Sequence, residues 1–477
     1  MKKNKNYILT IFMGCVLSFV FVGCVIDSTV TYTVSGNIEF YDTEGNITNP
    51  IISGTVKLFQ PTLFCDSLST LQNKYPVGAE INPILLMEHR LAGNPLASGT
   101  INSNGDFTLM ELLEGEYLLL YSVEGYGWHK QVCNVASDMS LHLKMRETIV
   151  CDENFNTING TVVWGPNQHI IVTEDVLIMN EASLTILENT IIEFGFGYCK
   201  LEVIGNFFVE GSSEFPVIFT SAEENPAEND WNALYNNSEN CLINNCIVEW
   251  SYYGFYNLGE ANLNQLVIKN CSSNGINLNG NSATIENTTI FGCENGVWAY
   301  GLDDGVFGGN ISNTLIFDNN TSGIELTSSS PLINNCFFSE NDKHIFIYYS
   351  CPKIEYCAFE NSRTYSIYSQ REAGIEGTIE IKYCDFTDEN TLIYCRRSAD
   401  IIANHNNFYV SNTFVFELIY YNGSNFINAQ NNWWGTSSET EIQNLIWDES
   451  DEPGGYDAGT VDYSSWEYHE IEDAGPQ

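Results

Sequence analysis

The sequence predicts an all-β protein whose larger part is a parallel β-helix, and three observations lead to this prediction. Between about Tyr252 and Tyr394 a four-residue segment recurs seven times, at steps of 21, 21, 27, 21, 22 and 26 residues. The segments alternate apolar and polar residues, as in Gly275-Ile276-Asn277-Leu278-Asn279, and a period of two is typical of strands. A second strand-like segment, such as Asn335-Cys336-Phe337-Phe338, lies upstream in each repeat.

The repeat length decides between helical and strand coils. A repeat of two helices needs about 33 residues or more, so a period of about 22 is too short for it. Steps that lengthen by about five residues indicate a solenoid, because each coil packs only on its neighbours and extra residues loop out. We therefore expect coils of strand, Asn-rich turn and strand, stacked about 4.8 Å apart.

The N-terminus reads as an export signal. Residues 1–6 are basic, and residues 7–22 form an apolar stretch that is short for a membrane span. Phe21-Val22-Gly23-Cys24 resembles the lipobox of bacterial lipoproteins, although Phe21 and Val22 depart from its usual residues. The resemblance implies a signal peptide over 1–23, a lipid on Cys24 that binds a membrane, and, with Val25 next, an outer-membrane location in the cell envelope, on its periplasmic or surface side. The alternatives are an ordinary signal peptide or a single membrane anchor.

Residues 24–148 predict a separate small domain of half-buried strands. Asn104-Gly105 is a hairpin turn signal. Gly105-Asp106-Phe107-Thr108-Leu109, followed by Gly115-Glu116-Tyr117 and Gly125-Tyr126, resembles the carboxypeptidase regulatory-like family. The resemblance implies a small antiparallel β-sandwich that acts as a spacer or assembly element without catalytic residues, and it leaves 64–96 as an unmatched insertion. We interpret the domain as a stalk; a sugar-binding sandwich is the alternative.

Residues 149–447 are the predicted β-helix, and 448–477 an acidic closing segment. The entry Ala182-Ser183-Leu184-Thr185-Ile186 and the exit Asn431-Asn432-Trp433-Trp434-Gly435-Thr436 resemble right-handed parallel β-helix proteins of secreted and cell-surface bacterial origin, the pectate-lyase-like architecture. That architecture carries lyases, hydrolases, epimerases and adhesins, so the resemblance implies the fold but no activity. In the closing segment, Tyr463 and Trp466 are candidates to cover the exposed edge of the last coil.

The cysteines favour an interior role over a metal site. Four of them share one repeat column whose other members are aliphatic or hydroxyl residues, which indicates small buried hydrophobes rather than disulfides. The column contains Cys246, Cys336, Cys357 and Cys384, with Leu266, Thr289 and Leu315 in the other coils. No Cys-x-x-Cys or paired His spacing is present, so we expect no metal or other cofactor, with calcium at the acidic residues as the alternative. Cys65 and Cys133 lie in the first domain and could pair.

The charge of the chain restricts its partners. Lys plus Arg number 18 and Asp plus Glu number 61, and such an acidic surface repels nucleic acid phosphates and anionic lipid headgroups. Neutral glycans are compatible with it, whereas anionic polysaccharides need a local basic patch or a bridging metal. We therefore expect no nucleic acid partner and keep polysaccharides as candidates.

The repeat register predicts one outward face rich in aromatic and amide side chains. If the isoleucines of the repeats point inward, the residue after each points outward, and so does the residue two further along. Aromatic rings and amides suit sugars, because a pyranose has an apolar face and a hydroxyl edge. The alternative is a plain sheet surface, since aromatic residues favour strands. The predicted ligand-binding residues are Tyr256, Trp298, Tyr300, Phe346, Tyr348, Tyr368 and Tyr394.

Catalysis at this face is the competing hypothesis. Glycoside hydrolysis needs two carboxylates, and the register gathers Asp303, Asp304 and Glu325 near the face. A lyase needs a base such as Arg396. These residues form no recognisable motif. A non-catalytic glycan-binding or adhesion protein is therefore our first hypothesis, a polysaccharide lyase or glycoside hydrolase the second, and a structural surface protein the third.

Overall fold

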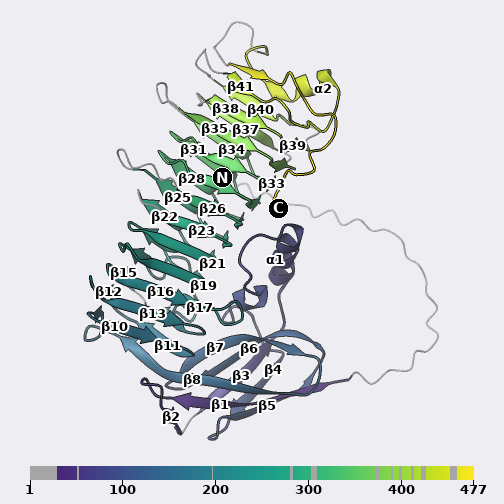
Figure 1. The fold of residues 1–477 in the computed structure, drawn as a ribbon. Helices are drawn as coiled ribbons and strands as arrows, with labels where there is room; N and C mark the ends of the chain where they lie inside the picture. Colours follow the sequence, from purple (N-terminus) through teal and green to yellow (C-terminus); the bar gives the residue numbers. More distant parts are fainter. Residues whose placement is uncertain are drawn as a thin grey trace, which may run out of the picture.

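The computed structural model describes residues 30–50, 53–195, 197–279, 283–301, 309–370, 377–387, 390–396, 400–409, 413–419, 426–451 and 459–477. It is an all-β molecule in which a short sandwich leads into a long parallel β-helix (Figure 1). The β-helix has three walls, which we call walls I, II and III. The predicted signal peptide and Cys24 lie outside the described residues. In the described part of the chain, no helix has the length and apolar composition needed to cross a membrane.

Wall I is a 13-stranded sheet in which every strand pairs in parallel with the strand one coil away. Its strands are β9 (Thr157–Ile158), β12 (Val176–Ile178), β15 (Leu201–Val203), β18 (Leu234–Asn236), β20 (Phe255–Asn257), β22 (Asn274–Asn279), β25 (Asn295–Tyr300), β28 (Ser322–Thr327), β31 (Lys343–Tyr348), β34 (Tyr365–Gln370), β37 (Thr391–Arg396), β40 (Phe416–Ile419) and β42 (Ile446–Trp447).

Wall II follows wall I in each coil. Its strands are β10 (Thr161–Trp164), β13 (Ser183–Leu187), β16 (Asn206–Glu210), β19 (Cys241–Glu249), β21 (Ala261–Lys269), β23 (Ala283–Glu286), β26 (Asn310–Ser312), β29 (Leu332–Asn334), β32 (Lys353–Glu355), β35 (Thr378–Lys382), β38 (Asp400–Asn404), β41 (Phe426–Asn428) and β43 (Thr460–Asp462).

Wall III completes the coil. The second halves of β19 and β21 belong to it. Its other strands are β11 (Gln168–Val172), β14 (Ile191–Phe194), β17 (Val217–Ser221), β24 (Thr289–Phe291), β27 (Leu315–Phe317), β30 (Phe337–Ser339), β33 (Ala358–Glu360), β36 (Asp385–Phe386) and β39 (Asn407–Phe408).

The corner between walls II and III explains the asparagines of the repeat. One residue per coil takes a positive φ there, for example 49° at Asn313 and 55° at Asn335, and Asn tolerates this left-handed conformation better than most residues. The side chains also bond from coil to coil, with Asn287 Nδ2 donating to Asn264 Oδ1 at 2.8 Å. The turn therefore fixes both the bend and the register.

The interior column contains the predicted cysteines, but two of its predicted members were wrong. Cys246 pairs with Leu266 as expected, whereas Thr289 pairs with Leu315 and then Phe337 in the neighbouring column. Thr288 and Thr314, both fully buried, occupy the interior positions instead. Cys336, Cys357 and Cys384 are free and buried, as predicted.

The sandwich is continuous with the β-helix. One sheet contains β1 (Tyr32–Tyr41), β2 (Ile47–Thr48), β5 (Asp106–Leu112) and β8 (Met139–Cys151), and the other has the order β4 (Ala97–Ile101), β3 (Gly54–Phe59), β6 (Gly115–Val123), β7 (Gly127–Val135). Strand β8 pairs in parallel with both β1 and β11, so the first sheet runs directly into wall III. Cys65 and Cys133 are free thiols in two different cores.

The insertion within the sandwich leaves it and lies along wall III (Figure 1). It contains α1 (Leu63–Lys74) and the short 3-10 helix η1 (Pro83–Leu86). Phe64 packs on Phe291 with ring centroids 5.3 Å apart, and Tyr75 on Phe337 at 4.7 Å. The segment that matched no family in the sequence is thus the cover of an apolar wall.

The contact between the insertion and wall III also contains buried charged side chains, at its end nearest the sandwich. Arg90 donates to both carboxylate oxygens of Glu88 and to the carbonyl oxygens of Ser221 at 2.7 Å and Glu223 at 2.9 Å. Burial alone would raise the pKa of Glu88, but the hydrogen bonds and charge of Arg90 hold that pKa well below its usual range. The ionised pair therefore persists in the interior because its donors and acceptors are satisfied.

The C-terminal residues close the β-helix and then turn back along it. Helix α2 (Glu439–Asn444) precedes β42, β43 pairs with β41, and Tyr463 and Trp466 pack against the core. The chain then returns over the corner between walls II and III, where the backbone N–H of Gly475 donates to the carbonyl of Tyr383 at 2.8 Å. The last residue, Gln477, donates to Asn335 Oδ1 at 2.6 Å.

Candidate functional site

The outward side chains of wall I form two parallel rows. Because neighbouring strands pair in register, equivalent residues of successive coils stand side by side. We call the first of these rows the aromatic row; its side chains lie over a buried layer of isoleucine, valine and leucine. From β18 to β42 the aromatic row is Tyr235, Tyr256, Asn277, Trp298, Glu325, Phe346, Tyr368, Tyr394, Glu417 and Trp447.

The second row lies two residues further along each strand. It contains Asn279, Tyr300, Thr327, Tyr348, Gln370, Arg396 and Ile419. The seven predicted ligand-binding residues therefore share one face, and each is half-buried. Sequence reasoning missed three residues of the aromatic row. Tyr235 precedes Tyr256 by the ordinary step of 21 residues, and Glu417 and Trp447 follow at the other end of the row.

The rings of the aromatic row do not have equal room. Tyr235 and Tyr256 stack on each other with centroids 4.8 Å apart, and Lys200 covers Tyr235 from the other side at 5.2 Å. Phe346 and Tyr368 are 5.1 Å apart, and Tyr368 and Tyr394 are 5.0 Å apart. Trp298 differs, because its neighbours within the row are Asn277 and Glu325. A polar residue therefore separates Trp298 from the next ring of the row on each side, and its ring stacks instead on Tyr300 of the second row, with centroids 5.7 Å apart.

Glu325 is the carboxyl that stands between Trp298 and Phe346 in the aromatic row. Burial raises the pKa of this carboxyl, while a hydrogen bond with Trp298 and the charge of Lys343 oppose the rise. Burial likewise raises the pKa of Tyr394. The centre of the face is thus poorly hydrated and carries one carboxyl between two aromatic rings.

The predicted catalytic residues do not form a converging group among the described residues. Asp303 and Asp304 lie outside those residues. Glu325 and Arg396 stand in different rows on β28 and β37, three rungs apart, which corresponds to about 14 Å along the axis. That separation is too large for Arg396 to act on an atom held at Glu325. The described residues also contain no cluster of three or more His, Cys, Asp or Glu side chains that would hold a metal ion.

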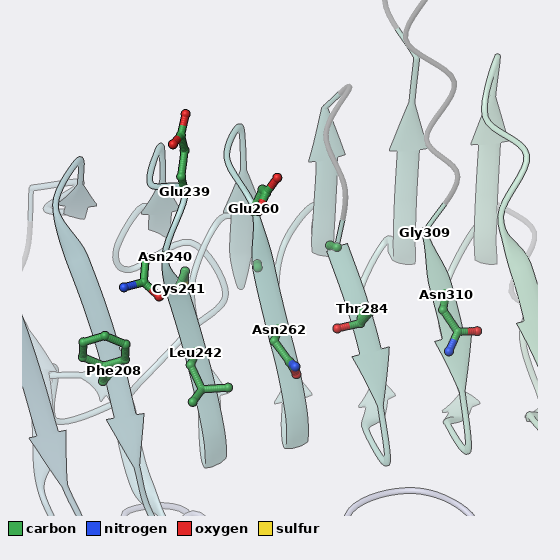
Figure 2. A pocket seen from close by; sticks show the side chains of 12 residues that line it. Phe208, Glu239, Asn240, Cys241, Leu242, Glu260, Asn262, Thr284, Gly309 and Asn310 are labelled. Atoms are coloured by element: carbon green, nitrogen blue, oxygen red, sulfur yellow. The ribbon is translucent and has the colours of Figure 1, made fainter.

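A separate groove of about 580 Å³ lies on wall II (Figure 2). Phe208 and Leu242 contribute apolar surface on adjacent strands, and the exposed carboxylates of Glu239 and Glu260 project from successive turns at one end of those strands. Asn262 follows on the next strand. The groove is open, and its two acids are exposed rather than buried, so it lacks the desolvated carboxyl found at Glu325.

Comparisons with known proteins bear on the fold. A family model described as "Right handed beta helix region" matches residues 229–330 and 274–434. The chain folds as a right-handed parallel β-helix. The fold class predicted from the repeats is therefore confirmed, including the hand that the resemblance implied.

No curated protein matches the chain. Among solved structures, it is similar to a variant of the catalytic domain of a GH87 alpha-1,3-glucanase in complex with tetrasaccharides. The identity is 11%, the TM-score is 0.32, and the match covers 87% of this chain and 89% of that one.

Proposed function

We propose that this protein is a non-catalytic glycan-binding module of the bacterial cell envelope and that the outward face of wall I is its binding surface. The observation that carries the proposal is the aromatic row. In it the parallel strand pairing aligns seven aromatic side chains, one amide and two carboxyls on one face of wall I. Aromatic rings contact the apolar faces of sugars, and the polar rungs supply hydrogen bonds to their hydroxyl edges.

The distribution of half-buried rings supports binding over a plain sheet surface. A contiguous row of partly exposed aromatic rings is a marker of an interaction site, because apolar surface in contact with water is unfavourable. The rows run parallel to the axis of the β-helix, so they suit an extended polymer better than a compact ligand. Lipidation at Cys24 belongs to the same proposal, since an anchored β-helix would present this face to envelope or external polysaccharides.

The test is a glycan-array screen with the soluble chain from residue 25, with release of products measured on any glycan that binds. Trp298→Ala combined with Tyr368→Ala should weaken binding at least tenfold, because two stacking surfaces are removed. Tyr468→Ala is the matched control, since Tyr468 is 66% exposed and lies in the closing segment. Binding that survives the double substitution would refute wall I as the site, and release of products would replace the non-catalytic proposal with an enzymatic one.

A further inference from the structure

Asn277 is an outward residue of wall I that is nevertheless fully buried. It stands in the aromatic row between Tyr256 on one side and Trp298 on the other. Its relative exposure is 0%, although no other layer of the described chain packs over this face. The two residues beside it in the row, Tyr256 and Trp298, are themselves only half-buried.

The Asn277 amide has no hydrogen-bond partner among the described residues. Neither its nitrogen nor its oxygen finds one, although both atoms are buried. Other buried amides of wall I pair through at least one atom: Asn236 Nδ2 donates to Asn257 Oδ1 at 2.7 Å, and Asn295 Nδ2 to Asn274 Oδ1 at 3.0 Å, although Asn295 Oδ1 has no partner among the described residues. An unpaired buried amide destabilises a folded chain, so its presence at a binding face needs a reason other than stability.

Once the cover of Asn277 is displaced, the interval between its two aromatic neighbours would have the width of one sugar ring. Tyr256 and Trp298 are two rungs apart, which is about 9.6 Å at the ordinary strand spacing. Two carbon contacts of about 4 to 4.5 Å, one on each face of a pyranose, fill that distance. Where aromatic rungs are adjacent, as at Tyr235 and Tyr256, the rings already contact each other and leave no such space.

We propose that Tyr256, Asn277 and Trp298 form a subsite that binds one neutral pyranose unit between the two rings, with adjacent hydroxyls of the sugar paired to the Asn277 amide. This inference rests on the proposed glycan-binding function. An amide offers two donors and one acceptor, which match the donor and acceptor capacity of two neighbouring hydroxyls. Binding requires the side chains that cover Asn277 to move aside, and rotamer changes of this kind are rapid.

The charges around the subsite select against acidic sugars. Glu325 is the next rung beyond Trp298, and Trp298 shares a hydrogen bond with it. No Lys or Arg occupies the aromatic row between Tyr235 and Trp447. A uronate placed between the rings would lie near the Glu325 carboxyl, and the nearby cation, Lys343, is already paired with Asp342 at 2.7 Å, so neutral polymers are the ligand class that this geometry favours.

The experiment uses Asn277→Leu, which keeps the side-chain volume and removes the amide. Binding to laminarin, xylan, mannan and polygalacturonate is measured by affinity electrophoresis and calorimetry, and Tm by thermal scanning. Asn134→Leu, at an exposed position of β7 in the sandwich, is the matched control. We expect wild type to bind a neutral polymer and not polygalacturonate. We also expect Asn277→Leu to raise Kd at least tenfold at a Tm equal to or above that of wild type, and Asn134→Leu to leave Kd unchanged.

The outcomes separate this inference from the function on which it rests. If wild type binds a neutral polymer and Asn277→Leu binds it equally well, the subsite is wrong while the glycan-binding function stands. Preference for polygalacturonate would overturn the neutral ligand class. If wild type binds none of these polymers and no glycan of the array, the proposed function fails and the subsite with it. A Tm of Asn277→Leu well below that of wild type would show that the amide is structural.

Discussion

Walls I and III both carry aromatic side chains in outward positions, but within the described residues only wall III is covered by another part of the chain. On wall III, Phe291 and Phe337 lie under α1 and the segment that follows it, and both are buried. On wall I, Tyr368 and its neighbours remain half-exposed. An outward aromatic row is therefore a contact surface in both places: the chain itself occupies one surface, and a ligand is the proposed occupant of the other.

The largest expected effect comes from the buried ion pair of the insertion, Glu88 with Arg90. Arg90→Ala should lower the free energy of unfolding by about 3–5 kcal/mol, because it leaves the carboxylate of Glu88 buried without its partner. Chemical denaturation measures this change. Arg90→Lys keeps the charge but loses the forked geometry of the guanidinium. The stability of this variant should therefore lie between those of wild type and Arg90→Ala. A loss below about 1 kcal/mol for Arg90→Ala would mean that the insertion does not hold wall III in solution.

The same truncation on the two walls gives the sharpest comparison. Phe337→Ala should cost about 3–5 kcal/mol of stability, because it opens a cavity between wall III and Tyr75. Tyr368→Ala should cost less than about 1 kcal/mol, because that ring is half-exposed. Thermal and chemical unfolding of both variants compare the walls directly. Equal losses would erase the distinction between a covered and an open wall.

Acid should weaken the covered wall. Burial lowers the pKa of His89 to about 4, against about 6.5 in the unfolded chain, so the unfolded state takes up the proton first. The stability that depends on neutral His89 is complete above pH 6.5 and is lost as pH falls toward 4, by about 3 kcal/mol in total. His89→Phe, which preserves an aromatic contact with Trp128, should flatten the pH dependence of Tm in this range. An unchanged slope would contradict the assignment.

The smallest effect is expected on the open wall and has the opposite sign. Burial raises the pKa of Glu325, so its ionised form destabilises the folded state, and stability is lost as pH rises through the raised pKa. Glu325→Gln should therefore raise the stability at pH 7, by less than about 1 kcal/mol, and leave it nearly unchanged at pH 4. The difference in Tm between variant and wild type at the two pH values measures this. A gain at pH 4 as large as that at pH 7 would point to packing rather than charge.

The repeats carried enough information to predict wall I in detail. The inward isoleucines and the outward residues after them alternate strictly, and the strand pairing places Tyr256, Trp298 and Tyr394 in the predicted row. This succeeds because wall I has one buried face and one open face, which is the condition for a clean period of two. Whether the row binds glycan stays a prediction.

Wall III was harder because both of its faces are buried. Leu315 points outward under the insertion, yet it is as apolar as an interior residue, so sequence reasoning placed it in the interior column in place of Thr314. The cover itself was unpredictable from local pattern, since α1 and wall III are more than 200 residues apart in sequence at the contact of Phe64 with Phe291. The full burial of the Asn277 amide also could not be predicted from the sequence, because it depends on the conformations of the surrounding side chains.

The returning C-terminal segment changes how the β-helix should come apart. A solenoid held only by contacts between adjacent coils loses its end coils independently of the rest. Here the insertion reaches wall III as far as Glu360, which forms an ion pair with Lys74 of the insertion. From the other end, Gln477 hydrogen-bonds to Asn335. The insertion and the returning C-terminal segment therefore contact the same middle coils. Unfolding of either end of the β-helix requires their contacts across several coils to break together. The protein should therefore unfold in a single cooperative transition, with slow hydrogen exchange extending into its terminal coils.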